Sequence, residues 1–142
     1  MLRRAGAEEM DALRAALVEA ELPVDDISEP GRLFFRLDGK ADFVAWAGLE
    51  LHRSDALVRS VVIGAQERGT GRGTRLVREL IDEARRLGIS RLWLLTTSAA
   101  SFFARFGFKE VSRDVVPAVI RGTREFRDIC PTSATCMSLS LD

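Results

Sequence analysis

The sequence predicts a single α/β domain (residues 1–142), in which helices pack on a mixed sheet that is mostly antiparallel with a parallel strand–helix–strand unit at its centre. Three observations predict this α+β arrangement. The chain has 142 residues and 46% hydrophobic content, ordinary values for one globular domain. Its first half carries short apolar runs separated by turn residues, typical of antiparallel strands. A glycine-rich turn, a helical pattern and a continuous apolar run follow, in the order typical of a parallel βαβ unit.

The N-terminal half is expected to form one helix and an antiparallel meander. Apolar residues recur at helical spacing over residues 7–20, and acidic residues occupy the first turn, where the helix dipole favours them. Residues 21–31 contain two prolines and two aspartates and are typical of a loop, which could border a substrate pocket. Asp38-Gly39-Lys40 is a hairpin signal between apolar runs. The expected strands are 2–5, 33–37, 43–51 and 56–63.

The C-terminal half begins with the clearest helical pattern in the chain. Apolar residues repeat every three or four positions over residues 76–87, and Gly88 provides a stop signal. The continuous apolar run within 91–97 is typical of a strand that is covered on both faces. The remaining expected elements are a short helix at 98–106 started by Ser98, a strand at 108–111, a helical turn at 117–123 and a closing strand at 134–141.

Residues 61–74 are the predicted site for a phosphate group. An apolar strand ends there in Arg68-Gly69-Thr70-Gly71-Arg72-Gly73, where residues without β-carbons let backbone N–H groups close around phosphate oxygens at a helix N-terminus. A dinucleotide-binding fingerprint would need its third glycine where Thr74 stands, and a Walker loop would need a lysine after its last glycine. The pattern present is Arg-x-x-Gly-x-Gly, which matches neither.

This glycine turn and a second motif together resemble the GNAT acyltransferases. Arg-x-x-Gly-x-Gly is the pyrophosphate-binding signature of that family. The family's later motif, Asn-x-x-Ala-x-x-x-Tyr-x-x-x-Gly-Phe, has the same spacing here in Thr96, Ala99, Phe103, Gly107 and Phe108. The resemblance covers nearly the whole chain and implies the GNAT acyl-CoA N-acyltransferase fold, in which the central parallel strands, here 56–63 and 91–97, splay apart.

A narrower resemblance points to the small acetyltransferases encoded in bacterial arsenic-resistance operons, whose tails also resemble the acetyltransferase domain of N-acetylglutamate synthases. The segments that carry it include Gly48-Leu49-Glu50, residues 58–61, residues 94–99 and much of the tail from residue 113 to residue 134.

The GNAT resemblance implies acetyl-CoA as the cofactor. Its pantetheine arm would pair with the backbone of the 56–63 strand as an added strand does, and backbone N–H groups of the glycine turn would hold its pyrophosphate, with two arginines adding charge. The candidate cofactor-binding residues are Val61, Ile63, Arg68, Gly69, Thr70, Gly71, Arg72, Gly73, Thr74, Thr96 and Phe103.

The reaction that the resemblance implies is direct transfer of acetyl to the amine of a small, amino-acid-like substrate. It needs a neutral amine and stabilisation of an oxyanion. The backbone N–H near Val62 is the candidate oxyanion donor, because a bulged strand leaves such groups unpaired. Glu50 is the candidate general base, directly or through water, with a solvated carboxylate as the alternative. The substrate-binding candidates, for which structural roles are the alternative, are Arg59, Ser60, Thr97 and Arg113, and strand alternation predicts that either Arg59 or Ser60 faces the pocket.

Phe103 departs from the family pattern. The family has a tyrosine there as the usual proton donor to the departing thiolate, and this chain contains no tyrosine. Water or a hydroxyl of Thr97, Ser98 or Ser101 could substitute, or the thiolate could leave unassisted, since an ordinary thiol has a pKa of about 8.5. We therefore expect slower chemistry rather than none. The competing hypothesis is a CoA-binding sensor or interaction module without catalysis, and acetylation of a peptide or protein is a third.

Charge balance and cysteine content bear on the expected partners, location and metal binding of the protein. The 21 basic and 21 acidic residues balance, which argues against a nucleic-acid or membrane partner that relies on a basic field. A small-molecule amine is the expected partner, and a homodimer is left open. The absence of a signal-peptide pattern and the presence of only two cysteines predict a reduced, cytoplasmic protein. Cys130 and Cys136 without a third nearby ligand predict no metal site, and His52 is expected to be solvated.

Overall fold

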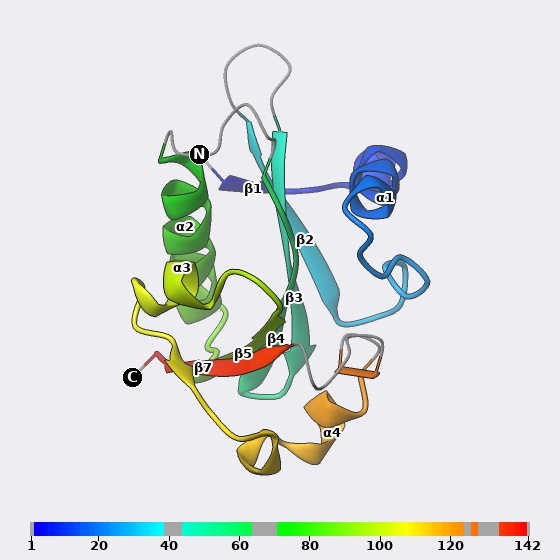
Figure 1. The fold of residues 1–142 in the computed structure, drawn as a ribbon. Coiled ribbons are helices and arrows are strands. Elements are labelled where there is room, and N and C mark those ends of the chain that lie inside the picture. Colours follow the sequence, from blue (N-terminus) through cyan, green and yellow to red (C-terminus); the bar gives the residue numbers. More distant parts are fainter. Residues whose placement is uncertain (1, 39–43, 64–70, 124–125, 128–133, 142) are drawn as a thin grey trace.

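The computed structural model describes residues 2–38, 44–63, 71–123, 126–127 and 134–141. Its sheet has seven strands in the order β1-β2-β3-β4-β5-β7-β6 (Figure 1). The strands are β1 (Leu2–Arg4), β2 (Arg32–Asp38), β3 (Val44–His52), β4 (Asp55–Val62), β5 (Arg91–Thr96), β6 (Lys109–Glu110) and β7 (Thr135–Ser140). The α-helices are α1 (Met10–Glu19), α2 (Arg72–Arg86), α3 (Ala100–Ala104) and α4 (Ala118–Arg121).

Neighbouring strands of this sheet are antiparallel except at its centre. The β4–β5 pair is parallel, and α2 makes the connection between the two strands. The last strand, β7, inserts between β5 and β6 and pairs antiparallel with both. The mixed α/β fold with a central parallel βαβ unit is therefore confirmed.

Helices cover both faces of the sheet (Figure 1). On one face, the apolar side of α2 packs with Phe103 of α3 over the strands and forms the largest hydrophobic cluster. On the other face, Leu13 and Leu17 of α1 pack with Phe34 and Trp46. Ile120 of α4 covers the same face further along the sheet. The strands at the centre of the sheet are thus covered on both sides.

The local differences from the predicted elements lie at helix ends. The first helix begins as a 3-10 turn at Ala7–Glu9 before α1. The third helix begins at Ala100, and the predicted start at Ser98 is wrong, because the Thr96 hydroxyl accepts the hydrogen bond from the Ala99 N–H instead. A 3-10 turn at Arg113–Val115 was not predicted.

The predicted hairpin turn falls largely on residues 39–43, outside the described residues. Within the described part of the chain, each helix is too short or too polar to cross a lipid bilayer.

Candidate active site

The candidate site is a cleft where the two central parallel strands separate. β4 and β5 pair only from Asp55 with Arg91 to Leu57 with Trp93. Beyond this point a cleft of about 900 Å³ opens between them, in agreement with the predicted splay. Its described lining comes from both strands, the α1 end, the α2 start and α3, and consists of Ala20, Leu22, Val58, Arg59, Ser60, Val61, Ile63, Gly71, Gly73, Thr74, Leu94, Leu95, Thr96, Thr97, Ser98, Ala99, Phe102, Phe103 and Arg105.

A β-bulge interrupts β4 at the mouth of this cleft. The register with β3 passes from Gly48–Arg59 to Trp46–Val62, so that Ser60 and Val61 together lie opposite one residue of β3. Ser60 has a φ of 59°, in the left-handed region that serine rarely adopts. The bulge removes the simple alternation of the strand, and Arg59 and Ser60 both line the cleft. The prediction that only one of them faces it is wrong for this reason.

The start of α2 forms one end of the cleft. Gly71 is the N-cap residue, with a φ of 87°, and Gly73 is buried in the first turn. A β-carbon on Gly73 would lie 2.7 Å from Cδ1 of Ile63, so glycine allows the helix to approach the end of β4 this closely. The first N–H groups of an α-helix lack partners within it and carry its positive dipole end, so this end of the cleft suits an anion.

The structure brings seven of the predicted cofactor-binding residues together in this cleft, namely Val61, Ile63, Gly71, Gly73, Thr74, Thr96 and Phe103. The predictions for Arg68, Gly69 and Thr70 lie outside the described residues, as does the side chain of Arg72.

The wall of the cleft next to the α2 start is aromatic, because a β-carbon on Gly73 would lie 3.4 Å from the Phe102 ring. Phe103 is 6% exposed, and its ring meets those of Phe102 and Phe108 edge to face, with centroids 5.3 and 5.7 Å apart. A phenyl ring offers packing but no proton. Arg105, which sequence analysis did not single out, also lines the cleft, and its guanidinium lies 5.8 Å from the Phe102 ring centroid. The only feature of the sequence that could have indicated this location is that Arg105 follows Phe103 by two residues.

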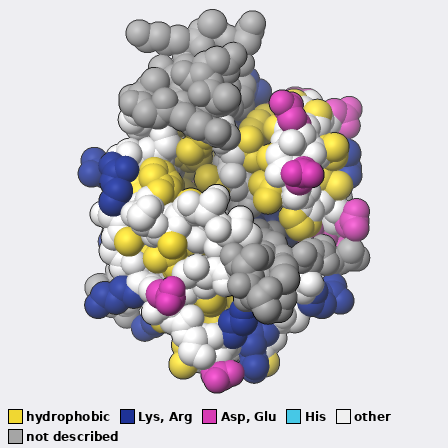
Figure 2. All heavy atoms as spheres, in the orientation of Figure 1, with side chains coloured by type: hydrophobic (Ala, Val, Ile, Leu, Met, Phe, Trp, Pro, Cys, Tyr) yellow, Lys and Arg dark blue, Asp and Glu magenta, His cyan; other side chains and the backbone are white. Residues whose placement is uncertain are grey.

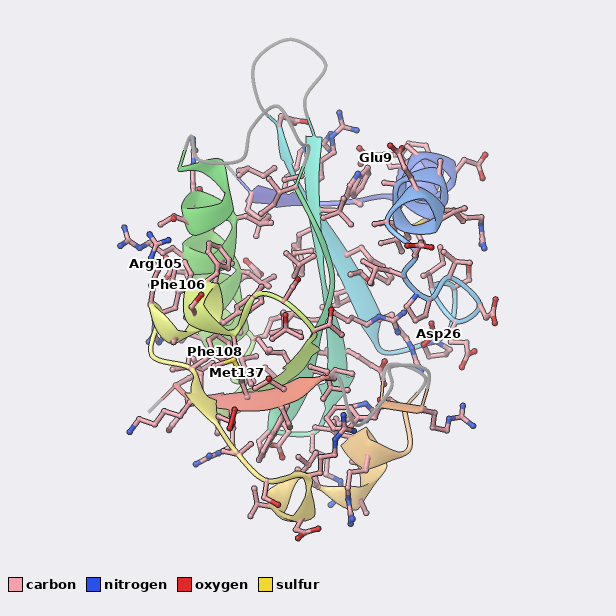
Figure 3. All side chains as sticks on the ribbon, in the orientation of Figure 1. Glu9, Asp26, Arg105, Phe106, Phe108 and Met137 are labelled. Atoms are coloured by element: carbon pink, nitrogen blue, oxygen red, sulfur yellow. The ribbon has the colours of Figure 1, made fainter. Side chains whose placement is uncertain are left out.

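Beneath the bulge lies a buried cluster of charged side chains. The Arg59 guanidinium is fully buried and donates to both carboxylate oxygens of Asp26, at 2.6 and 2.8 Å. It also donates to Glu50 Oε1 at 3.0 Å. Glu50 Oε2 lies 2.7 Å from His52 Nε2, and Arg32 lies 3.2 Å from Asp26. The cluster ties the α1–β2 loop, which carries Asp26 (Figure 3), to the bulged strand.

The charge of Asp26 depends on its two arginine partners. Burial by itself would raise the pKa of this carboxyl, but the hydrogen bonds and positive charges of Arg59 and Arg32 outweigh it and hold the pKa below its ordinary value. Asp26 is therefore ionised at neutral pH. Local sequence patterns gave no sign of this role, because its partners are 6 and 33 residues away along the chain.

These contacts bear on two predicted roles. Glu50 does not line the cleft, its side chain is 1% exposed and both carboxylate oxygens already have partners, so it cannot contact an amine in the cleft directly. Arg59 lines the cleft, but bidentate pairing with a substrate carboxylate would require it to release Asp26.

The other predicted catalytic and substrate-binding residues are spread over three places. Val62 resumes the pairing with β3 after the bulge, and its side chain packs toward the α1 face rather than into the cleft. Thr97 is exposed and lines the cleft. His52 is only 17% exposed and pairs with Glu50, so the expectation of a solvated histidine is wrong.

Arg113 lies apart from the cleft, in a separate cavity of about 430 Å³ that also contains Cys136. The Arg113 guanidinium lies 5.5 Å from the Phe126 ring centroid. Burial raises the pKa of the Cys136 thiol, and the positive charge of Arg113 opposes this only in part. The structure thus does not bring Arg113 to the predicted cleft. Cys130 lies outside the described residues.

The surface around these elements carries both signs of charge. Figure 2 shows basic and acidic side chains interspersed around the periphery of one face, with hydrophobic side chains between them.

Comparisons with known proteins agree with this geometry. A 64-residue segment, 45% of the chain, is 38% identical to the amino-acid acetyltransferase of Neisseria meningitidis serogroup A, of which it spans 15%. The fold resembles that of Rv2747 from Mycobacterium tuberculosis, solved with CoA, with a TM-score of 0.76 at 23% identity over 99% of this chain and 98% of that one. It also resembles N-acetylglutamate synthase from Neisseria gonorrhoeae complexed with coenzyme A and N-acetyl-glutamate, with a TM-score of 0.77 at 23% identity over 100% of this chain and 35% of that one.

The family is shown by a match to a sequence model that covers most of the chain. The matched region, residues 5–108, includes β4, the start of α2 with Gly71 and Gly73, β5 and α3, all of which contribute to the described lining of the cleft. The chain belongs to the acetyltransferase (GNAT) family.

Proposed function

We propose that residues 1–142 form an acetyl-CoA-dependent N-acetyltransferase that moves acetyl directly to the amine of a small, amino-acid-like substrate in a ternary complex. The observation that carries the proposal is the cleft between β4 and β5. It combines a strand edge free of β5, a bulge and a helix N-terminus within one cavity. A strand edge suits an extended amide chain and a helix N-terminus suits a phosphate, and CoA contains both.

Different residues of the cleft are proposed to bind different parts of CoA. The β4 backbone at Val61 and Ile63 pairs with the pantetheine amides, and the N–H groups from Gly69 to Thr74 take the pyrophosphate. Arg68, Arg72 and Arg105 add positive charge near the phosphates. Thr96 and Phe103 pack along the arm. Bound acetyl-CoA supplies an acetyl group activated as a thioester.

The amine substrate has a separate approach to the cleft. Ala20 and Leu22, at the end of α1, line the cleft from the face opposite α2 and α3. Among the described lining residues there is no carboxylate and no imidazole, so the proton of an ammonium group must leave through water. Glu50, one side chain behind Arg59, is the proposed final acceptor through such water, and the Val62 N–H is a proposed oxyanion donor.

The substrate class rests on the relatives. The Neisseria meningitidis relative is an amino-acid acetyltransferase, which supports an amino acid or a close analogue as the acceptor. The resemblance to acetyltransferases of arsenic-resistance operons extends this proposal to arsenic-containing amino acids. Thr97 at the cleft rim is a proposed contact for such a substrate.

One observation favours a second candidate, a CoA-binding sensor or interaction module. Phe103 stands where a tyrosine would supply a proton, and it leaves every feature that could hold CoA in place. CoA binding alone therefore cannot separate the two functions.

The test measures CoA binding and turnover on the same protein. Affinity for CoA is determined by calorimetry, and thiol release from acetyl-CoA is followed with a panel of proteinogenic amino acids, arsenic-containing amino acids and short peptides. Amine-dependent thiol release supports the transferase. Tight CoA binding without release across the panel favours the sensor, and no CoA binding contradicts both.

A further inference from the structure

We propose that the Ser60 hydroxyl is a catalytic hydrogen-bond donor to the acyl oxygen of the bound thioester, held in place by Arg59. The inference rests on the proposed acetyl transfer and assigns one of its chemical roles to a side chain. Ser60 lies in the bulge, three residues beyond the last β4–β5 pair at Leu57, it lines the cleft, and it is 3% exposed. It combines burial with access to the cleft.

The backbone conformation of Ser60 is the first argument. Its φ of 59° is one of three positive values at non-glycine residues in the described chain. The other two, at Glu21 and Arg53, lie in turns between elements, whereas Ser60 lies within a strand. Strained residues persist at sites where the surrounding structure fixes them and are concentrated in functional regions.

The hydrogen-bond inventory of the hydroxyl is the second argument. Ser60 Oγ lies 3.2 Å from Arg59 Nε, and arginine can only donate, so the serine oxygen accepts this bond. The hydroxyl proton therefore points elsewhere. Among the described residues no acceptor for that proton is found, and the space next to the side chain is the cleft.

The fixed position of Arg59 is the third argument. Asp26 and Glu50 hold the guanidinium at distances of 2.6 to 3.0 Å, so the hydroxyl that it contacts has little freedom to turn. The charges of Arg59, Arg32, Asp26 and Glu50 sum to zero, so net charge contributes little. The stabilisation comes from an oriented O–H dipole, the kind of preorganised donor that lowers the barrier of acyl transfer.

In this reaction Ser60 can donate to the carbonyl oxygen of the thioester but not to its sulfur. The amine lone pair forms the C–N bond while the carbonyl π electrons move onto oxygen. These electrons return as the C–S bond breaks, sulfur leaves with its electron pair as thiolate, and one amine proton passes to water. A serine alkoxide is far more basic than a thiolate of pKa about 8.5, so Ser60 cannot protonate the leaving group. It can donate to the oxygen on which charge grows.

Four hydroxyls near β5 and α3 are less suited to this role. The Thr96 hydroxyl already accepts a hydrogen bond from the Ala99 N–H in the turn before α3. Thr97 and Ser98 are exposed at the rim, where water competes for their hydrogen bonds. Ser101 is exposed and does not line the cleft.

The experiment compares Ser60→Ala and Ser60→Gly with wild type and with Ser138→Ala. Ser138 is a matched control, because it is a buried serine whose hydroxyl donates to the Leu92 carbonyl, outside the cleft. Glycine adopts the left-handed backbone at position 60 without strain, so Ser60→Gly remains usable if the alanine variant fails to fold. The readouts are kcat, CoA affinity and the infrared carbonyl stretch of bound acetyl-CoA.

We expect kcat to fall by about tenfold to about 100-fold in both Ser60 variants, while their CoA affinity stays unchanged. The kcat of Ser138→Ala is expected to equal that of wild type. The bound carbonyl stretch is expected to move to higher frequency when the hydroxyl is removed. A kcat within twofold of wild type in a folded Ser60 variant overturns the proposal. A loss of CoA affinity by the same factor as the loss of kcat also overturns it, because it would indicate a purely structural role. If wild type binds acetyl-CoA without turnover, the proposed transferase fails, and an unchanged carbonyl stretch then overturns the role of Ser60 separately.

Discussion

Replacement of Asp26 by asparagine tests whether the buried cluster holds the substrate-side loop against the bulged strand. Asp26 is fully buried and receives two short hydrogen bonds from Arg59 and further contacts from Arg32. Asparagine has nearly the same shape but carries no charge and keeps one acceptor oxygen. The variant therefore removes the carboxylate that both arginines share most closely, and Glu50 and the more distant Glu29 remain near them.

The expected cost follows from the burial of this pair. Loss of one partner from a buried ion pair costs about 3 to 5 kcal/mol, because the remaining charge is left uncompensated. The lower end applies here, since Glu50 still accepts from Arg59 and Arg32 is 17% exposed. A loss of about 3 kcal/mol is a large part of the 5 to 15 kcal/mol typical of a domain and lowers the Tm of a chain of this size by about 10 °C.

Urea unfolding of wild type and Asp26→Asn at several pH values measures this cost. The folded-state pKa of Asp26 lies below its ordinary value of 3.8, so its stabilisation is present above that pH and is lost as the pH falls through the folded-state value. The difference in free energy of unfolding between wild type and Asp26→Asn is expected to have its maximum value at pH 7 and to decrease below pH 3.8. Glu83→Gln, which breaks an exposed pair with Arg86, is the control and should change stability by less than about 1 kcal/mol.

Two results would refute the reasoning. A stability change below about 1 kcal/mol for Asp26→Asn at neutral pH would mean that the pair contributes no more than a surface contact. A difference that stays constant from neutral pH into acid would mean that ionised Asp26 is not the source of the stabilisation.

Three further predictions concern the cleft and the second cavity. Phe103→Tyr should raise kcat severalfold in steady-state thiol-release assays if departure of the thiolate limits turnover, with little change in stability, because the new hydroxyl enters the cleft. Gly73→Ala should weaken CoA binding by about tenfold in calorimetry, because its methyl group would lie 2.7 Å from Ile63 at the end of the cleft; unchanged affinity would remove Gly73 from the cofactor site. The Cys136 thiol should react with a disulfide reagent at pH 8 only on unfolding, since burial raises its pKa; rapid labelling of the native protein would contradict this.

Sequence reasoning predicted the fold well because the strongest signals are local. Periodicity over 76–87 located α2, and the apolar run at 91–97 located β5, since each pattern depends only on neighbours in the chain. The start of α3 was misplaced because Ser98 does not cap the helix. Ala99 is the N-cap residue, and its N–H donates to the Thr96 hydroxyl in the turn that follows β5.

The candidate site was predictable only where backbone features define it. The glycine pattern located the N-terminus of α2, since it reports directly on backbone freedom. The roles of Arg59 and Glu50 were not predictable. Asp26 reaches Arg59 from a loop 33 residues away, Arg59 in turn donates to Glu50, and no local pattern encodes these contacts. The simple alternation of β4 failed for a related reason, since a bulge depends on the pairing of two strands.

Binding and chemistry rest on different kinds of group in this cleft. The proposed contacts to CoA are mostly backbone groups of β4 and of the α2 N-terminus, which survive most side-chain substitutions. The proposed chemistry rests on a few side chains, of which Ser60 is one, whereas Phe103 packs the wall of the cleft and offers no proton. CoA affinity is therefore a poor measure of catalysis for this chain. A variant that changes kcat at constant CoA affinity is the observation that separates an acetyltransferase from a CoA-binding module.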